Sequence, residues 1–199
     1  MTDAPSGWDR RRRQLLGEYE RIALEQFAER GYHAVTVDEI AEAAAVSPRT
    51  LFRYFATKED MLLALPRRGL AATVESLARL APDPEPLRSA WRHLRGSLVQ
   101  VAPDPGLAQL WRRAASGAPD VIDRVRGERV EGMIDALSSY VARSLGVDPA
   151  RDVRVRIYGG LLAGIDLAML ESLGRIDDDY GRIFDGADRA LRALMASAP

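Results

Sequence analysis

The chain has 199 residues, 47% of them hydrophobic, and a formal net charge of −1. This apolar content is ample for a core, whereas the near-neutral total gives no overall electrostatic support for a nucleic-acid partner. The absence of cysteine excludes disulfides and thiolate metal sites and fits a reducing cytoplasm. The amino terminus lacks the apolar segment of a signal peptide, and the longest apolar run, residues 157 to 170, is too short to span a bilayer. We therefore expect a cytoplasmic protein without a membrane partner.

The first predicted helix runs from about Arg10 to the glycine at position 31. Residues 1 to 8 are polar and contain Pro5 and Gly7, so we expect them to form a flexible arm. The basic run Arg10 to Arg13 has two interpretations. It contacts DNA phosphates or a minor groove, or it is a solvated helix start.

Three helix starts follow one another between residues 36 and 58. Thr36 with Glu39 has the spacing of a capping box, in which each side chain bonds the other's backbone amide. Ser47 is a good N-cap, and Pro48 suits the first helical position, where its missing N–H costs nothing. Two short helices joined by a turn of about three residues indicate a helix-turn-helix, whose second helix can lie in a DNA major groove.

The second of these helices has two different faces. Leu51, Phe52 and Phe55 are expected to point inward, and the polar residues outward. Lys58, the only lysine, lies in the first turn of the next helix, where the helix dipole disfavours a cation. It therefore contacts a phosphate or is simply solvated. Arg49 and Thr50 suit base edges, and Arg53 and Tyr54 suit phosphates. The candidate DNA-binding residues are Thr36, Ser47, Pro48, Arg49, Thr50, Arg53, Tyr54 and Lys58.

Four segments, at 27–32 (FAERGY), 36–41 (TVDEIA), 46–55 (VSPRTLFRYF) and 57–59 (TKE), resemble the amino-terminal domain of TetR-type transcriptional repressors. The resemblance covers about the first third of the chain. It implies an all-α homodimer that binds a palindromic operator on double-stranded DNA and releases it when a small molecule enters the larger domain. Many relatives have tyrosine at the position of Phe52 and use its hydroxyl on a phosphate. Here that contact is absent or falls to Arg53 and Tyr54.

The domain division expected from this resemblance places an arm and a three-helix DNA-binding domain at residues 1–57, and a larger ligand-binding and dimerisation domain at 58–199. In the larger domain Pro66 should kink or break the helix that starts at Lys58, near Arg67. After a proline-rich linker at 82–86, helices are predicted from Leu87, from Leu107 to Gly117, and over 120–145, 149–173 and 180–196.

The helix at 149–173 is apolar on every side from residue 157 to 170, which indicates burial on every side. A second copy of the chain is the economical cover for one of its faces. Glycines 159, 160 and 164 each cost about 0.8–1.0 kcal/mol relative to alanine, and they make sense where another backbone comes close. The helices at 149–173 and 180–196 are predicted to form the dimer interface together. The predicted interface residues are Gly160, Gly164, Phe184 and Leu191.

A ligand site is only weakly indicated. Asp166 is the one charge in the apolar run, and it either bonds a backbone group or an arginine across the dimer, or lines a cavity. Four aromatic residues either line a pocket with it or belong to the core, and an apolar lining would suit a hydrophobic or amphipathic effector. The candidate ligand-binding residues are Trp91, Trp111, Tyr140, Tyr158 and Asp166.

Catalytic chemistry finds little support in two histidines, no cysteine and no glycine-rich phosphate loop. We expect no enzyme activity, no cofactor and no metal. A helical enzyme and a protein-binding adaptor are the contrasting hypotheses. The exposed basic face of Arg49, Arg53 and Lys58 favours DNA over the adaptor.

Overall fold

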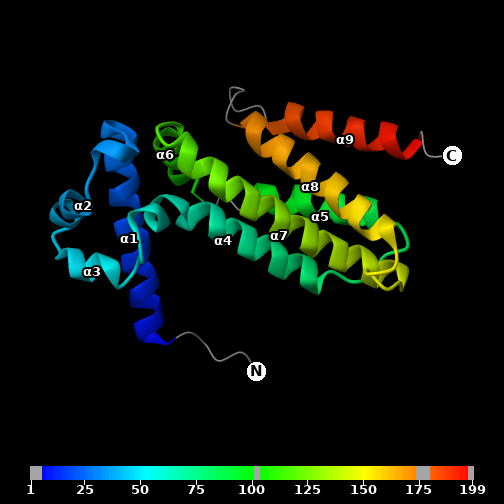
Figure 1. The fold of residues 1–199 in the computed structure, drawn as a ribbon, viewed down its shortest axis with the longest axis horizontal. Coiled ribbons are helices and arrows are strands. Elements are labelled where there is room, and N and C mark those ends of the chain that lie inside the picture. The colour runs from blue at the N-terminus through cyan, green and yellow to red at the C-terminus, as the bar shows by residue number, and fades with distance from the viewer. Residues whose placement is uncertain (1–5, 101–103, 174–179, 197–199) are drawn as a thin grey trace. The chain divides into compact units, whose positions relative to one another are not determined.

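The computed structural model describes residues 6–100, 104–173 and 180–196, and over these residues the chain is helical, with no strand (Figure 1). The predicted all-α fold class is therefore confirmed. Contacts divide the chain into two compact units. Unit 1 consists of Met1–Arg68 and Ala102–Arg126, and unit 2 of Gly69–Val101 and Gly127–Pro199.

Unit 1 begins with α1 (Gly7–Arg30), followed by the short 3-10 helix η1 (Tyr32–Ala34), α2 (Val37–Ala43) and α3 (Pro48–Phe52). Ser6 and Asp9 form a capping box, so α1 starts at Gly7. The expectation of a flexible arm through residue 8 is wrong for residues 6 to 8, because this cap satisfies the first free amides of the helix. Gly31 ends α1 with φ 86°, a positive angle that side-chain-bearing residues rarely adopt.

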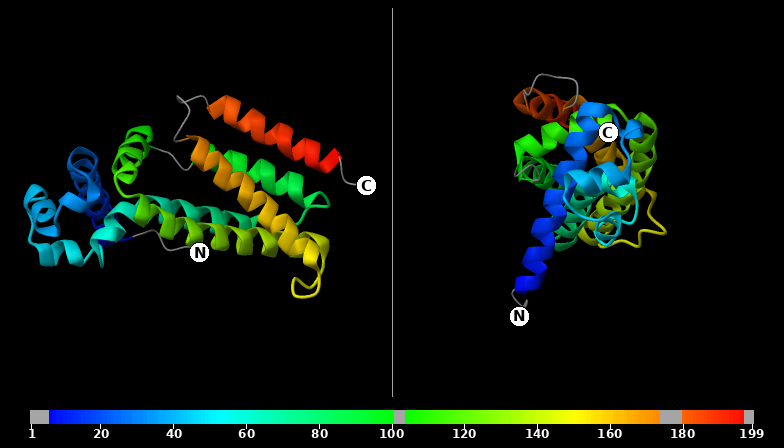
Figure 2. Two further views of the ribbon diagram at one scale, coloured as in Figure 1. Left: turned by 45° about the horizontal axis from the view of Figure 1, so that its top comes forward. Right: turned by 90° about the vertical axis from the view of Figure 1, so that its left-hand side faces the viewer.

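The core of unit 1 forms where α1 meets α2, α3, α6 (Pro105–Ser116) and the first turns of α4 (Lys58–Arg79). Figure 2 shows α6 beside α1. Glu20 of α1 is fully buried and is paired with Arg68 of α4, with Nη2–Oε2 at 2.7 Å. Burial raises the pKa of Glu20, and the guanidinium opposes that shift. The fully buried side chains of the unit 1 core include Ala23, Leu24, Ile40, Leu51, Leu62 and Ala114.

Unit 2 contains the rest of α4, α5 (Pro86–Gln100), the rest of α7 (Pro119–Leu145), α8 (Val153–Leu173) and α9 (Tyr180–Ala196). Pro66 lies inside α4, which continues to Arg79, so of the predicted kink or break near Arg67 the break is absent. Buried residues on both sides of the proline, among them Leu63 and Leu77, hold the helix together despite the missing hydrogen bond. The core of unit 2 includes Trp91, Leu94, Met133, Leu137, Tyr140 and Leu162.

The glycines of α8 fall into two groups. A Cβ on Gly159 would lie 2.3 Å from Ser138 Oγ and 2.9 Å from the carbonyl oxygen of Ile134, both on α7. Among the described residues, a Cβ on Gly160 or Gly164 would meet nothing within 4 Å. The close helix approach therefore occurs inside the chain, at Gly159, whereas the other two glycines face open space in a single chain.

We predict that Gly159→Ala lowers the free energy of unfolding by about 1–3 kcal/mol, because the Ile134 carbonyl must move to admit the methyl group. The matched control is Gly127→Ala, at an exposed position of α7 where a Cβ meets nothing within 4 Å. It should raise stability by about 1 kcal/mol through helix propensity. Urea unfolding of both variants measures the difference, and equal midpoints would contradict the close approach.

Candidate nucleic-acid interface

Both helices of the predicted helix-turn-helix start at the residues that the sequence indicates. The Thr36 amide donates to Glu39 Oε2 at 2.7 Å, and the Glu39 amide donates to Thr36 Oγ1 at 3.3 Å. Ser47 Oγ accepts from the Thr50 amide at 3.2 Å, with Pro48 in the first helical position. Ala45, in the turn between the two helices, has φ 53°. The capping box and the N-cap are thus confirmed.

The outer face of α3 carries Arg49, Phe52 and Arg53, all exposed. Leu51 and Phe55 are buried as predicted, but the prediction for Phe52 is wrong, because its side chain is 49% exposed. One residue is a turn of about 100°, so a side chain directly after the buried Leu51 points away from the core. Figure 1 places α3 next to α2 at one side of unit 1.

The other predicted DNA-contacting residues near α3 differ in exposure. Thr36 and Ser47 are exposed, whereas Pro48 and Thr50 are half-buried. Tyr54 is also half-buried, since its ring packs edge-on against Tyr19 of α1 with the ring centroids 5.1 Å apart. Only part of Tyr54 therefore faces outward.

Lys58 has a role that the sequence did not reveal. Its Nζ donates to the carbonyl oxygens of Tyr32 and Val35, both at 2.7 Å, and lies 4.2 Å from the centroid of the Tyr32 ring. Burial lowers the pKa of Lys58, and the carboxylate of Glu39 opposes the shift. The alternative of a freely solvated lysine is excluded. A phosphate contact would have to use the third N–H of the ammonium.

Glu39 is held in its ionised form by the same local structure. The Thr36 backbone amide, and after it the guanidinium of Arg30, lowers the pKa of Glu39 from 4.5 to about 2. The carboxylate at the start of α2 therefore fixes the cap and joins α2 to the end of α1.

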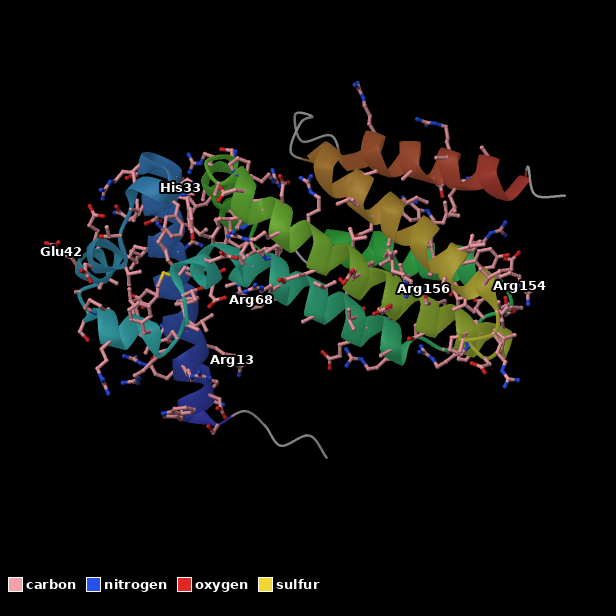
Figure 3. The ribbon with its side chains drawn as sticks, in the orientation of Figure 1. Arg13, His33, Glu42, Arg68, Arg154 and Arg156 are labelled. Atoms are coloured by element: carbon pink, nitrogen blue, oxygen red, sulfur yellow. The ribbon has the colours of Figure 1, made fainter. Side chains whose placement is uncertain are left out.

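The basic run at the start of α1 is exposed, as is Trp8 at 70%. Arg13 Nε donates to the Asp9 carbonyl at 3.3 Å, and the Arg12 guanidinium lies 5.9 Å from the Trp8 ring. Figure 3 shows Arg13 near the free end of this helix. These contacts are compatible with both interpretations of the run.

The candidate ligand-binding residues are divided between the units. Trp111 belongs to unit 1, where its indole donates to the Leu62 carbonyl at 2.8 Å. The other four lie in unit 2, where Trp91 is buried and donates to Asp188 Oδ1 at 3.1 Å. Tyr158 is half-buried against the unit 2 core. The structure therefore does not bring the five residues into one unit.

Asp166 is 3% exposed and accepts a hydrogen bond from Arg129 Nη2 at 3.1 Å. Burial raises the pKa of Asp166, and the Arg129 charge opposes the shift. An arginine does pair with this carboxylate, but it comes from the same chain. Among the described residues, two buried polar atoms of unit 2 have no hydrogen-bond partner: Nε of Arg129 and the hydroxyl of Tyr140.

The predicted dimer-interface residues differ in whether their own chain covers them. Gly160 and Gly164 face open space, as given above. Leu191 is 3% exposed and packs in the core of unit 2 in its own chain, so its side chain is already covered. The side chain of Phe184 lies outside the described residues.

Over the described ranges, no group of three or more histidine, aspartate or glutamate side chains is placed to hold a metal ion. No helix there is long and apolar enough to cross a membrane.

An all-helical chain with a capped pair of short helices and an exposed arginine-bearing face on the second of them defines a helix-turn-helix DNA-binding protein. Residues 21–65 match the model of the family described as bacterial regulatory proteins, tetR family. The chain is 30% identical over 183 residues to the HTH-type transcriptional regulator TcmR of Streptomyces glaucescens, covering 87% of this chain and 76% of that protein. It is 39% identical over 173 residues to the HTH-type transcriptional activator FasR of Mycolicibacterium smegmatis, covering 82% and 77%.

Solved structures have the same fold. A TetR-family regulator from Mesorhizobium loti aligns with a TM-score of 0.55 and 20% identity over 94% of this chain and 97% of that one. Another from Streptomyces coelicolor aligns with a TM-score of 0.53 and 21% identity over 98% and 99%. The chain belongs to the tetR family of bacterial regulatory proteins.

We predict that Glu39→Gln lowers the Tm in a pH-dependent way. Because the folded-state pKa of Glu39 is depressed to about 2, the ionised carboxylate contributes stability above its unfolded value of 4.5 and loses it as the pH falls through about 2. The Tm difference from wild type should be largest above pH 4.5 and shrink toward pH 2.

Thermal unfolding across that pH range makes the measurement. Glu42→Gln removes another exposed carboxylate of α2, which Figure 3 shows on the outer side of that helix, and controls for the lost charge. A Tm difference for Glu39→Gln that stays constant across the range would contradict the capping role.

Proposed function

We propose that the chain is a ligand-responsive transcriptional regulator, acting as a repressor that binds a palindromic operator as a homodimer and is released by a small molecule. The observation that carries the proposal is the exposed face of α3, where Arg49 and Arg53 project from a helix capped at Ser47. One relative is named an activator, so a transcription assay must register both signs of regulation.

The roles of the DNA-contacting residues follow from their positions. Arg49 and Thr50, in the first turn of α3, are proposed to reach base edges. Arg53 and the exposed part of Tyr54 contact phosphates, as does the third N–H of Lys58. Thr36, Ser47 and Pro48, at the starts of α2 and α3, lie against the DNA backbone. In this proposal residues 1–57 bind DNA, and residues 58–199 bind the effector and form the dimer.

The dimer is proposed to form on one face of α8. Val153 is 70% exposed and Ile157 is 57% exposed, and Gly160, Leu161 and Gly164 continue the same helical face. An exposed apolar stripe of this kind normally has a partner. A second copy is the partner we choose, because a two-fold dimer would also present two recognition helices about one DNA turn apart, roughly 34–36 Å.

The effector is proposed to bind in unit 2, near Asp166, Arg129 and Tyr140. A buried donor without an acceptor costs about 1–3 kcal/mol, so Arg129 Nε and the Tyr140 hydroxyl would each gain from a polar group of a ligand. Both residues are on α7, about 16 Å apart along its axis, so two different polar groups would be needed. The side chains around them are apolar, among them Met133 and Leu137. An amphipathic compound with an oxygen-bearing group fits this lining. Trp91 and Tyr158 stay candidates for contact with the effector at this site in unit 2. Trp111 lies in unit 1, so it would contact an effector only if one bound there.

We predict that Arg49→Ala lowers operator affinity by about 1–3 kcal/mol and relaxes the preference at one base position, as expected for a lost base contact. Lys58→Ala should weaken binding to all sequences alike, because it removes both the two carbonyl bonds within unit 1 and the proposed phosphate contact. Only the loss of the phosphate contact should reduce the salt slope, by about 1. Competition binding on a selected operator at several salt concentrations measures both effects.

Arg79→Ala, at an exposed position of α4 in unit 2, is the control, since it should leave affinity and slope unchanged. Unchanged affinity and preference for Arg49→Ala would remove Arg49 from the interface. An unchanged salt slope for Lys58→Ala would limit Lys58 to its two carbonyl bonds within unit 1.

We predict that Gly164→Leu weakens the dimer by about 1–3 kcal/mol through overpacking, because a Cβ there meets no described residue of its own chain within 4 Å and the larger side chain would occupy the space proposed for a partner. DNA affinity should fall with dimer stability although no DNA contact is touched. Sedimentation and operator binding measure the two effects. Gly127→Leu, at an exposed position of α7, should leave the chain dimeric. A Gly164→Leu chain that sediments as wild type would move the interface off this face.

A further inference from the structure

We propose that Phe52 is a specificity-determining residue that recognises the methyl group of a thymine in the operator. The inference rests on the proposed binding of DNA by α3. It assigns a role to the one aromatic ring that the outer face of α3 presents to solvent, where the sequence led us to expect a core residue.

The first observation is that the ring of Phe52 takes no part in the core of unit 1. Its side chain is 49% exposed, whereas Leu51 just before it is fully buried and Phe55 is 3% exposed. An α3 built for packing alone would place a polar residue at this position. About half of the surface of Phe52 therefore remains available to a partner.

The second observation is the setting of the ring. Phe52 lies three residues after Arg49 and directly before Arg53, and both arginines are exposed. Residues three apart are neighbours on a helix surface, so Arg49 and Phe52 share the outward face. Two cations beside an apolar ring complement a polyanion whose grooves contain apolar groups, which commits this face to duplex DNA.

Helix geometry then determines which base pair the ring meets. Three residues advance about 4.5 Å along a helix, and successive base pairs are about 3.4 Å apart. If Arg49 reaches one base edge and the axis of α3 runs along the groove, the ring of Phe52 lies over the neighbouring pair.

The chemistry of the ring decides what it can recognise there. Phenylalanine has no hydrogen-bond donor or acceptor, and the apolar group that B-DNA presents in the major groove is the C5-methyl of thymine. Packing of the ring on a deoxyribose is the competing arrangement, and it would be independent of sequence.

The test removes the methyl group instead of the base. An operator is first selected from random duplexes with the full-length chain, and each thymine is then replaced in turn by deoxyuridine, which lacks only the C5-methyl. For the wild-type chain, deoxyuridine at one thymine position in each half-site should lower the affinity about 3- to 10-fold.

Phe52→Ala should bind the thymine operator more weakly and should show no further loss with deoxyuridine at that position. Phe52→Leu should retain part of the sensitivity. Arg49→Ala is the matched control, because it should lose affinity on the same duplexes while the methyl effect persists. Thermal unfolding of Phe52→Ala should match the wild type, as expected for a half-exposed side chain.

A wild-type chain that is indifferent to every deoxyuridine replacement would overturn the inference, as would a methyl effect that survives in Phe52→Ala. Either result leaves the proposed function intact, since the operator is still bound. Failure to select any duplex would instead overturn the proposed function itself.

Discussion

The arrangement of the candidate interface depends on two hydrogen bonds that the ammonium group of Lys58 donates. They join the first residue of α4 to the carbonyls of Tyr32 and Val35, which lie 26 and 23 residues earlier in the chain. Those carbonyls belong to the segment between α1 and α2. The start of α4, which follows the turn after α3, is therefore fixed to the segment between α1 and α2. Because of this link, the five-residue helix α3 does not depend on its own hydrogen bonds alone for its position.

The outward face of α3 follows from this constraint together with the core. Leu51 and Phe55 fix the rotation of the helix by being buried, and Tyr54 adds an edge-on contact with Tyr19 of α1. Once the rotation is fixed, Arg49, Phe52 and Arg53 have no direction except outward. Preorganising the face in this way lowers the entropy cost of binding, because only the long arginine side chains remain to be ordered.

Local signals in the sequence were sufficient for the helix starts at Thr36, Ser47 and Lys58, since a cap is formed by residues three apart. They were not sufficient for Phe52, where apolar character suggested burial but the rotation of a helix of five residues is set by its neighbours. The role of Lys58 was also hidden, because its acceptors are backbone carbonyls and leave no trace in side-chain patterns. Nor did the sequence show that α6 would pack with unit 1, which is a matter of long-range contacts.

The three glycines of α8 cannot be told apart from the sequence, but the structure distinguishes them. In the sequence Gly159, Gly160 and Gly164 are equivalent, since each lowers helix propensity by a similar amount. In the fold, Gly159 has a cause within the chain, because α7 leaves no room for a Cβ, whereas no described residue comes within 4 Å of a Cβ on Gly160 or Gly164. Gly160 and Gly164, which have no neighbour among the described residues, lie on the same face as the exposed Val153 and Ile157. The proposed packing of a second backbone against α8 would account for the glycines and the exposed apolar residues together.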